Sequence, residues 1–151
     1  MKLRNSIKAI IIRDHRILAI KVTDSFGDYY LLPGGGQNPG ETVHEALHRE
    51  CQEEINCNVI IHDLRIIREY IGKNHEFKEF DHDVHQIEFM FRCSLAENAE
   101  PRVGNMPDTN QNSVEWLDLK DLTKYRLYPQ SLRDVFVNIE QNNQIYYGDL
   151  N

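Results

Sequence analysis

The chain has 151 residues, the length of one domain, and its 40% hydrophobic and 27% charged content is ordinary for a globular protein. Its formal net charge of −7 argues against a protein that coats nucleic acid, because such binding depends on neutralising phosphates with basic side chains. No stretch approaches the roughly twenty apolar residues of a membrane-spanning helix, and the N-terminal run is too short and too charged for a signal peptide.

The first part of the chain predicts a β-hairpin, a short strand and a glycine-rich loop. The hairpin strands are expected over Ile7–Arg13 and Ile17–Val22, which are rich in β-branched residues and flank a tight turn. Tyr29–Leu32 predicts a further short strand. Residues 33–40 contain four glycines and two prolines, so we expect a loop there.

The rest of the chain predicts two helices among strands. One helix begins at Glu41 or Thr42 and ends near Ile55, and another runs from Pro129 to about Ile139. We expect, in chain order, a strand at Asn58–Tyr70, a polar loop at 72–83, strands at Val84–Leu95 and Val114–Leu119 separated by a long polar loop at 97–112, and a frayed polar tail at 141–151. This order predicts one domain over residues 1–140 of the α/β (α+β) class, a sandwich built on a mixed sheet.

The three cysteines are the basis for an expected location. Cys51, Cys57 and Cys93 form no C-x-x-C pair, and their number is odd. We interpret them as reduced thiols of a cytoplasmic protein.

The first predicted helix places acidic residues on its apolar side. At about 100° per residue, Val43 and Leu47 lie on the stripe that should face the core, and Glu54 falls between them on the helical wheel. Glu50 lies beside the same stripe, with Glu53 on its flank. Carboxylates that approach a region of low dielectric constant are costly unless they are paired or bound to a cation. This arrangement favours a hard divalent cation, most readily Mg²⁺, although a solvated acidic last turn is the simpler alternative.

A longer pattern of spaced charges contains these acids. Gly35, Glu41, Arg49-Glu50 and Glu53-Glu54 resemble the Nudix box G-x5-E-x7-R-E-U-x-E-E-x-G-U, where U is apolar, over Gly35 to Cys57. The chain departs from the pattern at one position, where Asn56 replaces the final glycine. Since asparagine tolerates the left-handed conformation better than most residues, we expect Asn56 to end the helix there.

The resemblance implies a Nudix-type α/β/α sandwich and a role for each matching residue. Glu50, Glu53 and Glu54 would bind the metal, with a backbone carbonyl at Gly35 as a further ligand. Glu50 and Glu53 would also belong to the catalytic group, together with Arg49 and Glu41, an orienting pair that joins helix and loop. The general base stays open between one of these glutamates and a glutamate of a later loop.

The resemblance also implies a reaction. It is Mg²⁺-dependent hydrolysis, with Mn²⁺ as a substitute, of the pyrophosphate bond in a nucleoside diphosphate linked to another group. The expected partner is a nucleotide-type small molecule, with neither a membrane nor bulk nucleic acid, and a homodimer is one open oligomeric state. Two alternatives are a nucleotide sensor without activity and, less favoured, an isoprenoid diphosphate isomerase, which shares the fold.

Other residues are weaker candidates for the site. Tyr29 lies in a predicted strand before the box and could stack on a base or sugar, and Glu88 lies on the polar face of the strand at 84–95. Solvated positions are the simpler interpretation for two further groups: the acids Glu97, Glu100, Asp108 and Glu115, and the histidines His75, His82 and His85. Phe26 and Tyr30 are further candidates for stacking on a base or sugar, although one of Tyr29 and Tyr30 is expected to face the core. Tyr146 and Tyr147 could form an oligomer contact or have no role.

Overall fold

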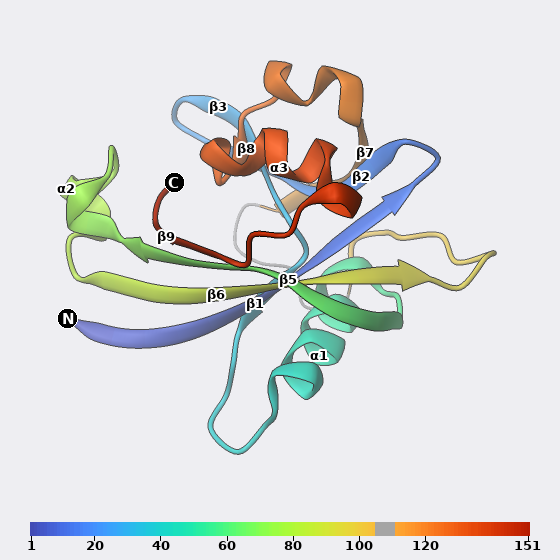
Figure 1. Cartoon of the computed structure of the whole chain (residues 1–151), viewed down its shortest axis with the longest axis horizontal. Helices are drawn as coiled ribbons and strands as arrows, with labels where there is room; N and C mark the ends of the chain where they lie inside the picture. Colours follow the sequence, from blue (N-terminus) through green and yellow to red (C-terminus); the bar gives the residue numbers. More distant parts are fainter. Residues whose placement is uncertain (105–110) are drawn as a thin grey trace.

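The computed structural model describes residues 1–104 and 111–151, which form a mixed β-sheet with helices on both faces (Figure 1). The strands are β1 (Lys2–Arg13), β2 (Arg16–Asp24), β3 (Gly27–Leu31), β4 (Gly34–Gly36), β5 (Val59–Ile71), β6 (Val84–Leu95), β7 (Gln111–Asp118), β8 (Leu127–Tyr128) and β9 (Tyr146–Asp149). The α-helices are α1 (Val43–Ile55), α2 (Lys78–Asp81) and α3 (Arg133–Val137), and short 3-10 turns occupy Gly72–Asn74, Leu119–Lys124, Gln130–Leu132 and Ile139–Gln141. The mixed sheet and the α+β class are as the sequence predicts.

The sheet is centred on a parallel pair of long strands. Its order is β8-β3-β2-β1-β6-β5-β9, with β4 paired to β1 and β7 paired to β2. Strands β1 and β6 run parallel from the Lys2–Val84 pair to the Ile11–Cys93 pair, whereas β1 and β2, and β5 and β6, are antiparallel. A parallel pair at the centre of a sheet is usually covered on both faces, and that is the case here.

The two faces of the sheet carry separate hydrophobic cores. Helices α1 and α3 lie on opposite faces of the sheet (Figure 1). Because side chains alternate along a strand, Ile7, Ala9 and Ile11 of β1 belong to the core with Leu47 of α1, while Ile10 belongs to the core with Phe136 of α3. Within the described residues, no helix has the length and apolar character needed to cross a bilayer.

The face of β6 that the sequence predicts to be polar is partly buried by the second core. The sequence places Glu88, Arg92 and Ser94 on a polar face, yet Glu88 is only 2% exposed and Met90 on the same face is fully buried. Around Met90 this face packs against α3 and its neighbouring 3-10 turns, whereas the Arg92 side chain is 37% exposed.

The C-terminal tail is ordered, so the predicted fraying is wrong. Strand β9 pairs in parallel with β5, and the N–H of Leu150 donates to the carbonyl of Glu69 at 3.1 Å. Tyr147 and Leu150 pack against the core on the α3 side. A mostly polar tail thus completes the edge of the sheet through its backbone and two apolar side chains.

Four segments also differ from the predictions. The glycine loop contains β4, which pairs with β1 from Ser6 to Lys8. The loop at 72–83 contains a 3-10 turn and α2, and β7 already begins at Gln111. The predicted helix from Pro129 to Ile139 is α3 flanked by 3-10 turns, a segment in which no side chain caps the start of α3.

Both ends of α1 have side-chain or backbone caps. Thr42 is the N-cap and forms a capping box with Glu45, so the helix begins at Val43. Asn56 is the C-cap, with φ 55° and ψ 35°. The left-handed cap predicted from the sequence is therefore confirmed.

The left-handed cap predicts different costs for two substitutions of Asn56. Asn56→Val should lower the free energy of unfolding by about 1–2 kcal/mol, because a β-branched side chain is strained at positive φ. Asn56→Gly removes the same side chain but accepts this φ, so it should be close to neutral. Urea unfolding of both variants measures the difference, and equal stabilities would contradict a strained cap.

Candidate active site

Three consecutive glycines of β4 each contact a side chain of α1. The N–H of Gly34 donates to Glu54 Oε2 at 2.9 Å, and Arg49 Nη2 donates to the carbonyl of Gly36 at 2.9 Å. Between them, a Cβ on Gly35 would lie 2.6 Å from the carboxyl carbon of Glu50. Any side chain at this position would therefore force the Glu50 carboxylate to move away from β4.

Arg49 joins the glycine loop to the acidic residues of α1. Its Nε and Nη2 form a bidentate pair with Glu41 at 3.1 and 2.6 Å, and its Nη1 lies 2.9 Å from Glu50 Oε1 and 3.4 Å from Glu53 Oε2. The hydrogen bonds from Arg49, and then that from the backbone N–H of Asn38, lower the pKa of Glu41. Arg49 and Glu41 therefore lie where an orienting pair would.

The side chains around β4 supply oxygen donors, the type of ligand that a hard divalent cation prefers. Glu50, Glu53 and Glu54 offer carboxylate oxygens, and the missing Cβ of Gly35 leaves the Glu50 carboxylate next to the backbone. Across residues 1–104 and 111–151, no three His, Cys, Asp or Glu side chains converge on one point. Instead, Glu50 and Glu53 turn toward Arg49, while Glu54, 1% exposed, bonds to Gly34.

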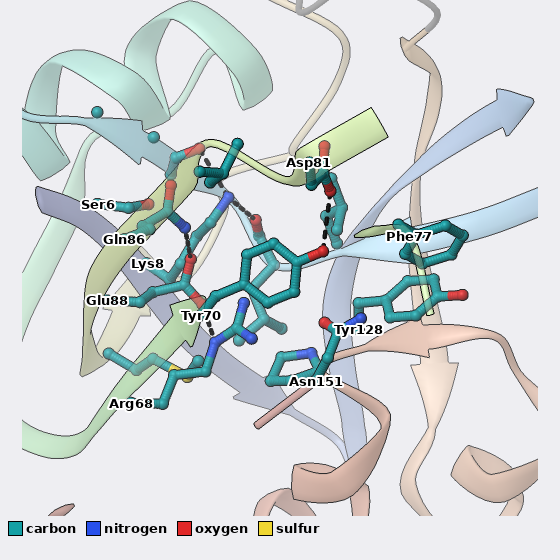
Figure 2. Close-up of a pocket in the computed structure, with 18 of the residues that line it drawn as sticks. Ser6, Lys8, Arg68, Tyr70, Phe77, Asp81, Gln86, Glu88, Tyr128 and Asn151 are labelled. Atoms are coloured by element: carbon teal, nitrogen blue, oxygen red, sulfur yellow. Dashed lines mark hydrogen bonds and ion pairs between the residues drawn. The ribbon is translucent and has the colours of Figure 1, made fainter. Parts of the chain in front are cut away.

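A cavity of about 630 Å³ opens beside β4. Figure 2 shows Ser6, Lys8 and Gln86 on one side of it and the rings of Phe77 and Tyr128 on the other. Gly34–Gly36 and Glu50 also line the cavity, so it extends from the acidic end of α1 to an aromatic wall. This volume is in the range of small-molecule sites.

The floor of the cavity is a buried ion pair. Arg68 Nε donates to Glu88 Oε1 at 2.9 Å, and Gln86 Nε2 donates to Glu88 Oε2 at 2.9 Å (Figure 2). Burial raises the pKa of Glu88, but the charges of Arg68 and Lys8 and hydrogen bonds from Arg68 and Ser6 outweigh it, so the pKa is lowered. Glu88 lines the cavity, with both of its oxygens bonded to neighbouring side chains.

The aromatic wall is held by a second ion pair. Tyr29 and Tyr128 pack edge to face with ring centroids 5.9 Å apart, and Phe77 packs on Tyr128 in the same way at 5.7 Å. Arg126 lies over both tyrosine rings and forms a bidentate pair with Asp24 at 2.9 and 3.2 Å. Tyr29 thus lines the cavity, where the sequence suggested a contact for a base or sugar.

No local sequence pattern indicates that several of the residues lining the cavity belong to a site. Arg68, Tyr128 and Arg126 reach the cavity through pairings between strands far apart in the chain. Lys8 could have been found, since Arg4, Ser6 and Lys8 recur at every second position of β1.

The weaker candidates lie elsewhere. Asp108 is outside the described residues, and neither Glu97, Glu100 nor Glu115 lines the cavity. The histidines form no common site: His75 Nε2 lies 2.6 Å from Asp149, His85 Nε2 lies 3.1 Å from Glu69, and His82 is beside Asp83. Tyr30 packs against Tyr125, and Tyr146 and Tyr147 belong to the β9 segment.

Comparison with known proteins establishes the family. The NUDIX domain model matches residues 2–137, so the chain belongs to the Nudix family. Nucleoside triphosphatase NudI of Salmonella agona is 36% identical over 67 residues, which are 42% of this chain and 48% of that protein. NudI of Salmonella arizonae matches to the same extent. The chain thus spans about half the length of these curated relatives.

Solved structures share the fold. A MutT NUDIX hydrolase from Burkholderia pseudomallei gives a TM-score of 0.67 at 24% identity, covering 92% of this chain and 98% of that one. A NUDIX hydrolase from Nitrosomonas europaea gives 0.71 at 17% identity, covering 93% and 89%. An ADP-ribose pyrophosphatase from Streptococcus suis 89-1591 gives 0.65 at 18% identity, covering 97% and 98%.

The Glu88 ion pair predicts a pH-dependent contribution to stability. Because the folded-state pKa is lowered, this contribution is present above the ordinary value of 4.5 and is lost as the pH falls through the folded pKa. Glu88→Gln should therefore lower the free energy of unfolding at neutral pH, and its difference from wild type should shrink in acid. Urea unfolding from pH 7 to pH 3 tests this. A difference in the free energy of unfolding that stays constant over this pH range would contradict the prediction. Glu79→Gln, on the exposed face of α2, is the control for the loss of a surface charge.

Proposed function

We propose that the protein catalyses Mg²⁺-dependent hydrolysis of a pyrophosphate bond in a nucleoside diphosphate linked to another group, with Mn²⁺ as a substitute. The observation that carries the proposal is the contact of all three glycines of β4 with Arg49, Glu50 and Glu54 of α1. Family membership supports the reaction class. The names of the relatives, nucleoside triphosphatase and ADP-ribose pyrophosphatase, agree with a nucleotide substrate.

Glu50, Glu53 and Glu54, with a carbonyl near Gly35, are the proposed cation ligands. When bound, Mg²⁺ neutralises diphosphate charge and lowers the pKa of an attacking water. Arg49 orients this group: it is bonded to Glu41 on the loop and to Gly36 on β4, so the spacing between helix and loop is fixed. Glu53 is the most exposed of the three carboxylates, and we propose it as the acceptor of the water proton.

The two ends of the cavity suggest how a nucleotide lies. The acidic end, at β4 and Glu50, would face the diphosphate. The aromatic wall of Tyr29, Phe77 and Tyr128 offers apolar ring surface for a base.

The two other functions considered from the sequence are less well supported. A sensor without activity needs none of the box acids, whereas this chain keeps every charged residue of the box. An isomerase of isoprenoid diphosphates would use further acid and base groups, commonly a cysteine. Cys51, Cys57 and Cys93 are buried and do not line the cavity, and burial raises the pKa of the Cys51 thiol.

Removing one carboxylate tests the assignment. Glu53→Gln should lower kcat about 10²–10⁴-fold, because the substitution removes an anionic ligand and proton acceptor without changing size. The assay is release of phosphate, pyrophosphate or nucleoside monophosphate with Mg²⁺ from a panel of nucleoside triphosphates, ADP-ribose and dinucleoside polyphosphates.

A matched control lies on the same helix. Glu45 is exposed and caps α1, and glutamine is accepted at this position of a capping box, so Glu45→Gln should keep wild-type activity. Near-normal kcat in Glu53→Gln, or an equal loss in both variants, would refute the role of Glu53.

A further inference from the structure

Three polar side chains of β1 form a row along the cavity. Arg4, Ser6 and Lys8 alternate with core residues and therefore project from the same face of the strand, where all three line the cavity. Strand β1 rises about 3.3 Å per residue, so the Cα atoms of Arg4 and Lys8 are about 13 Å apart. The row runs beside β4, since Ser6 pairs with Gly36 and Lys8 with Gly34.

The row faces the acidic side chains of α1 across the glycine strand. Gly34 and Gly35 contact Glu54 and Glu50 on the helix side. On the other side, a Cβ on Gly36 would lie 3.0 Å from Arg4 Nη2. The cavity beside β4 is therefore lined by Glu50 of α1 and by Arg4 and Lys8 of β1.

The cations that line the cavity differ in their partners. Arg68 is paired with Glu88, and Arg126 with Asp24. Lys8 donates to the carbonyls of Leu32 and Gly34 at 3.3 and 3.1 Å, which leaves its charge without a carboxylate in direct contact. Arg4 is exposed, and its side chain makes neither a hydrogen bond nor an ion pair with the rest of the described chain.

The guanidinium of Arg4, which has no carboxylate partner among the described residues, suits an anionic ligand. The chain carries a net charge of −7, so an anion that approaches this cavity needs local positive charge. Guanidinium binds phosphate through two parallel N–H···O bonds, and such charge-assisted bonds are stronger than neutral ones.

We propose that the Arg4–Ser6–Lys8 row binds the phosphate chain of the substrate and that Arg4 contacts a terminal phosphate. This inference rests on the proposed function and makes it more specific. Lys8 lies inside the cavity, next to Ser6 and opposite the aromatic wall (Figure 2). Arg4 lies two residues beyond Ser6 toward the N-terminus, against Gly36. The preferred substrate is then a nucleoside triphosphate rather than a nucleoside diphosphate joined to a neutral sugar.

The experiment compares two substrates that differ in the group at that end. We would measure kcat and KM with Mg²⁺ for nucleoside triphosphates and for ADP-ribose in wild type, Arg4→Ala and Arg4→Lys. Arg4→Ala should lower kcat/KM for the triphosphate about 10- to 100-fold, chiefly through KM, because hydrogen bonds to charged groups are lost. ADP-ribose hydrolysis should be almost unchanged, and Arg4→Lys should restore part of the loss.

Arg16→Ala is the matched control, because Arg16 is exposed on β2 and does not line the cavity. It should behave as wild type with both substrates. An equal loss of activity on both substrates in Arg4→Ala, or no loss on the triphosphate, would overturn the proposal.

Calorimetric binding of inorganic tripolyphosphate separates this proposal from the proposed function. If wild type hydrolyses neither nucleotide, the proposed function fails, but Arg4→Ala should still bind tripolyphosphate at least about tenfold more weakly than wild type. Equal binding by the two proteins would show that Arg4 is not a phosphate contact.

Discussion

The approach of β4 to α1 is the constraint on which the rest of the structure depends. Gly34 would clash with the carbonyl of Ile7 if it carried a Cβ, at 2.0 Å, and Gly35 would clash with Glu50. Because both clashes are avoided, β4 can pair with β1 on one edge and receive Glu54 and Arg49 on the other. Acidic side chains that would be costly on the core side of a helix are thereby bonded to backbone or to arginine.

The same approach organises the charge around the cavity. Arg49 fixes the loop through Glu41 on the helix side, while the buried pair of Arg68 and Glu88 fixes the floor on the sheet side. Within each ion pair, the positive and negative charges neutralise each other. Among the described residues, Arg4 and Lys8 line the cavity with no carboxylate in direct contact, within a protein of net negative charge. A phosphate chain in the cavity would lie between a cation held by the carboxylates of α1 on one side and the side chains of Arg4 and Lys8 on the other.

The sequence was sufficient wherever a local pattern decides the structure. The 3.6-residue period of α1 predicts that Glu54 turns inward, and it is 1% exposed; the identity of Asn56 predicts its left-handed cap. The sequence was insufficient wherever two distant segments meet. Strand β9 and the Arg68–Glu88 pair arise from strand pairing, and a polar tail or an isolated glutamate carries no sign of its partner.

The most direct test of the account is Mn²⁺ binding by the Gly35→Ala variant, measured by electron paramagnetic resonance alongside urea unfolding. A methyl group at this position would displace the Glu50 carboxylate from its place against β4. The account predicts that Mn²⁺ affinity falls at least about tenfold, as for the loss of a ligand or its support, while the variant remains folded. Unchanged Mn²⁺ affinity in a folded Gly35→Ala protein would contradict the claim that β4 and the acidic residues of α1 form one cation site.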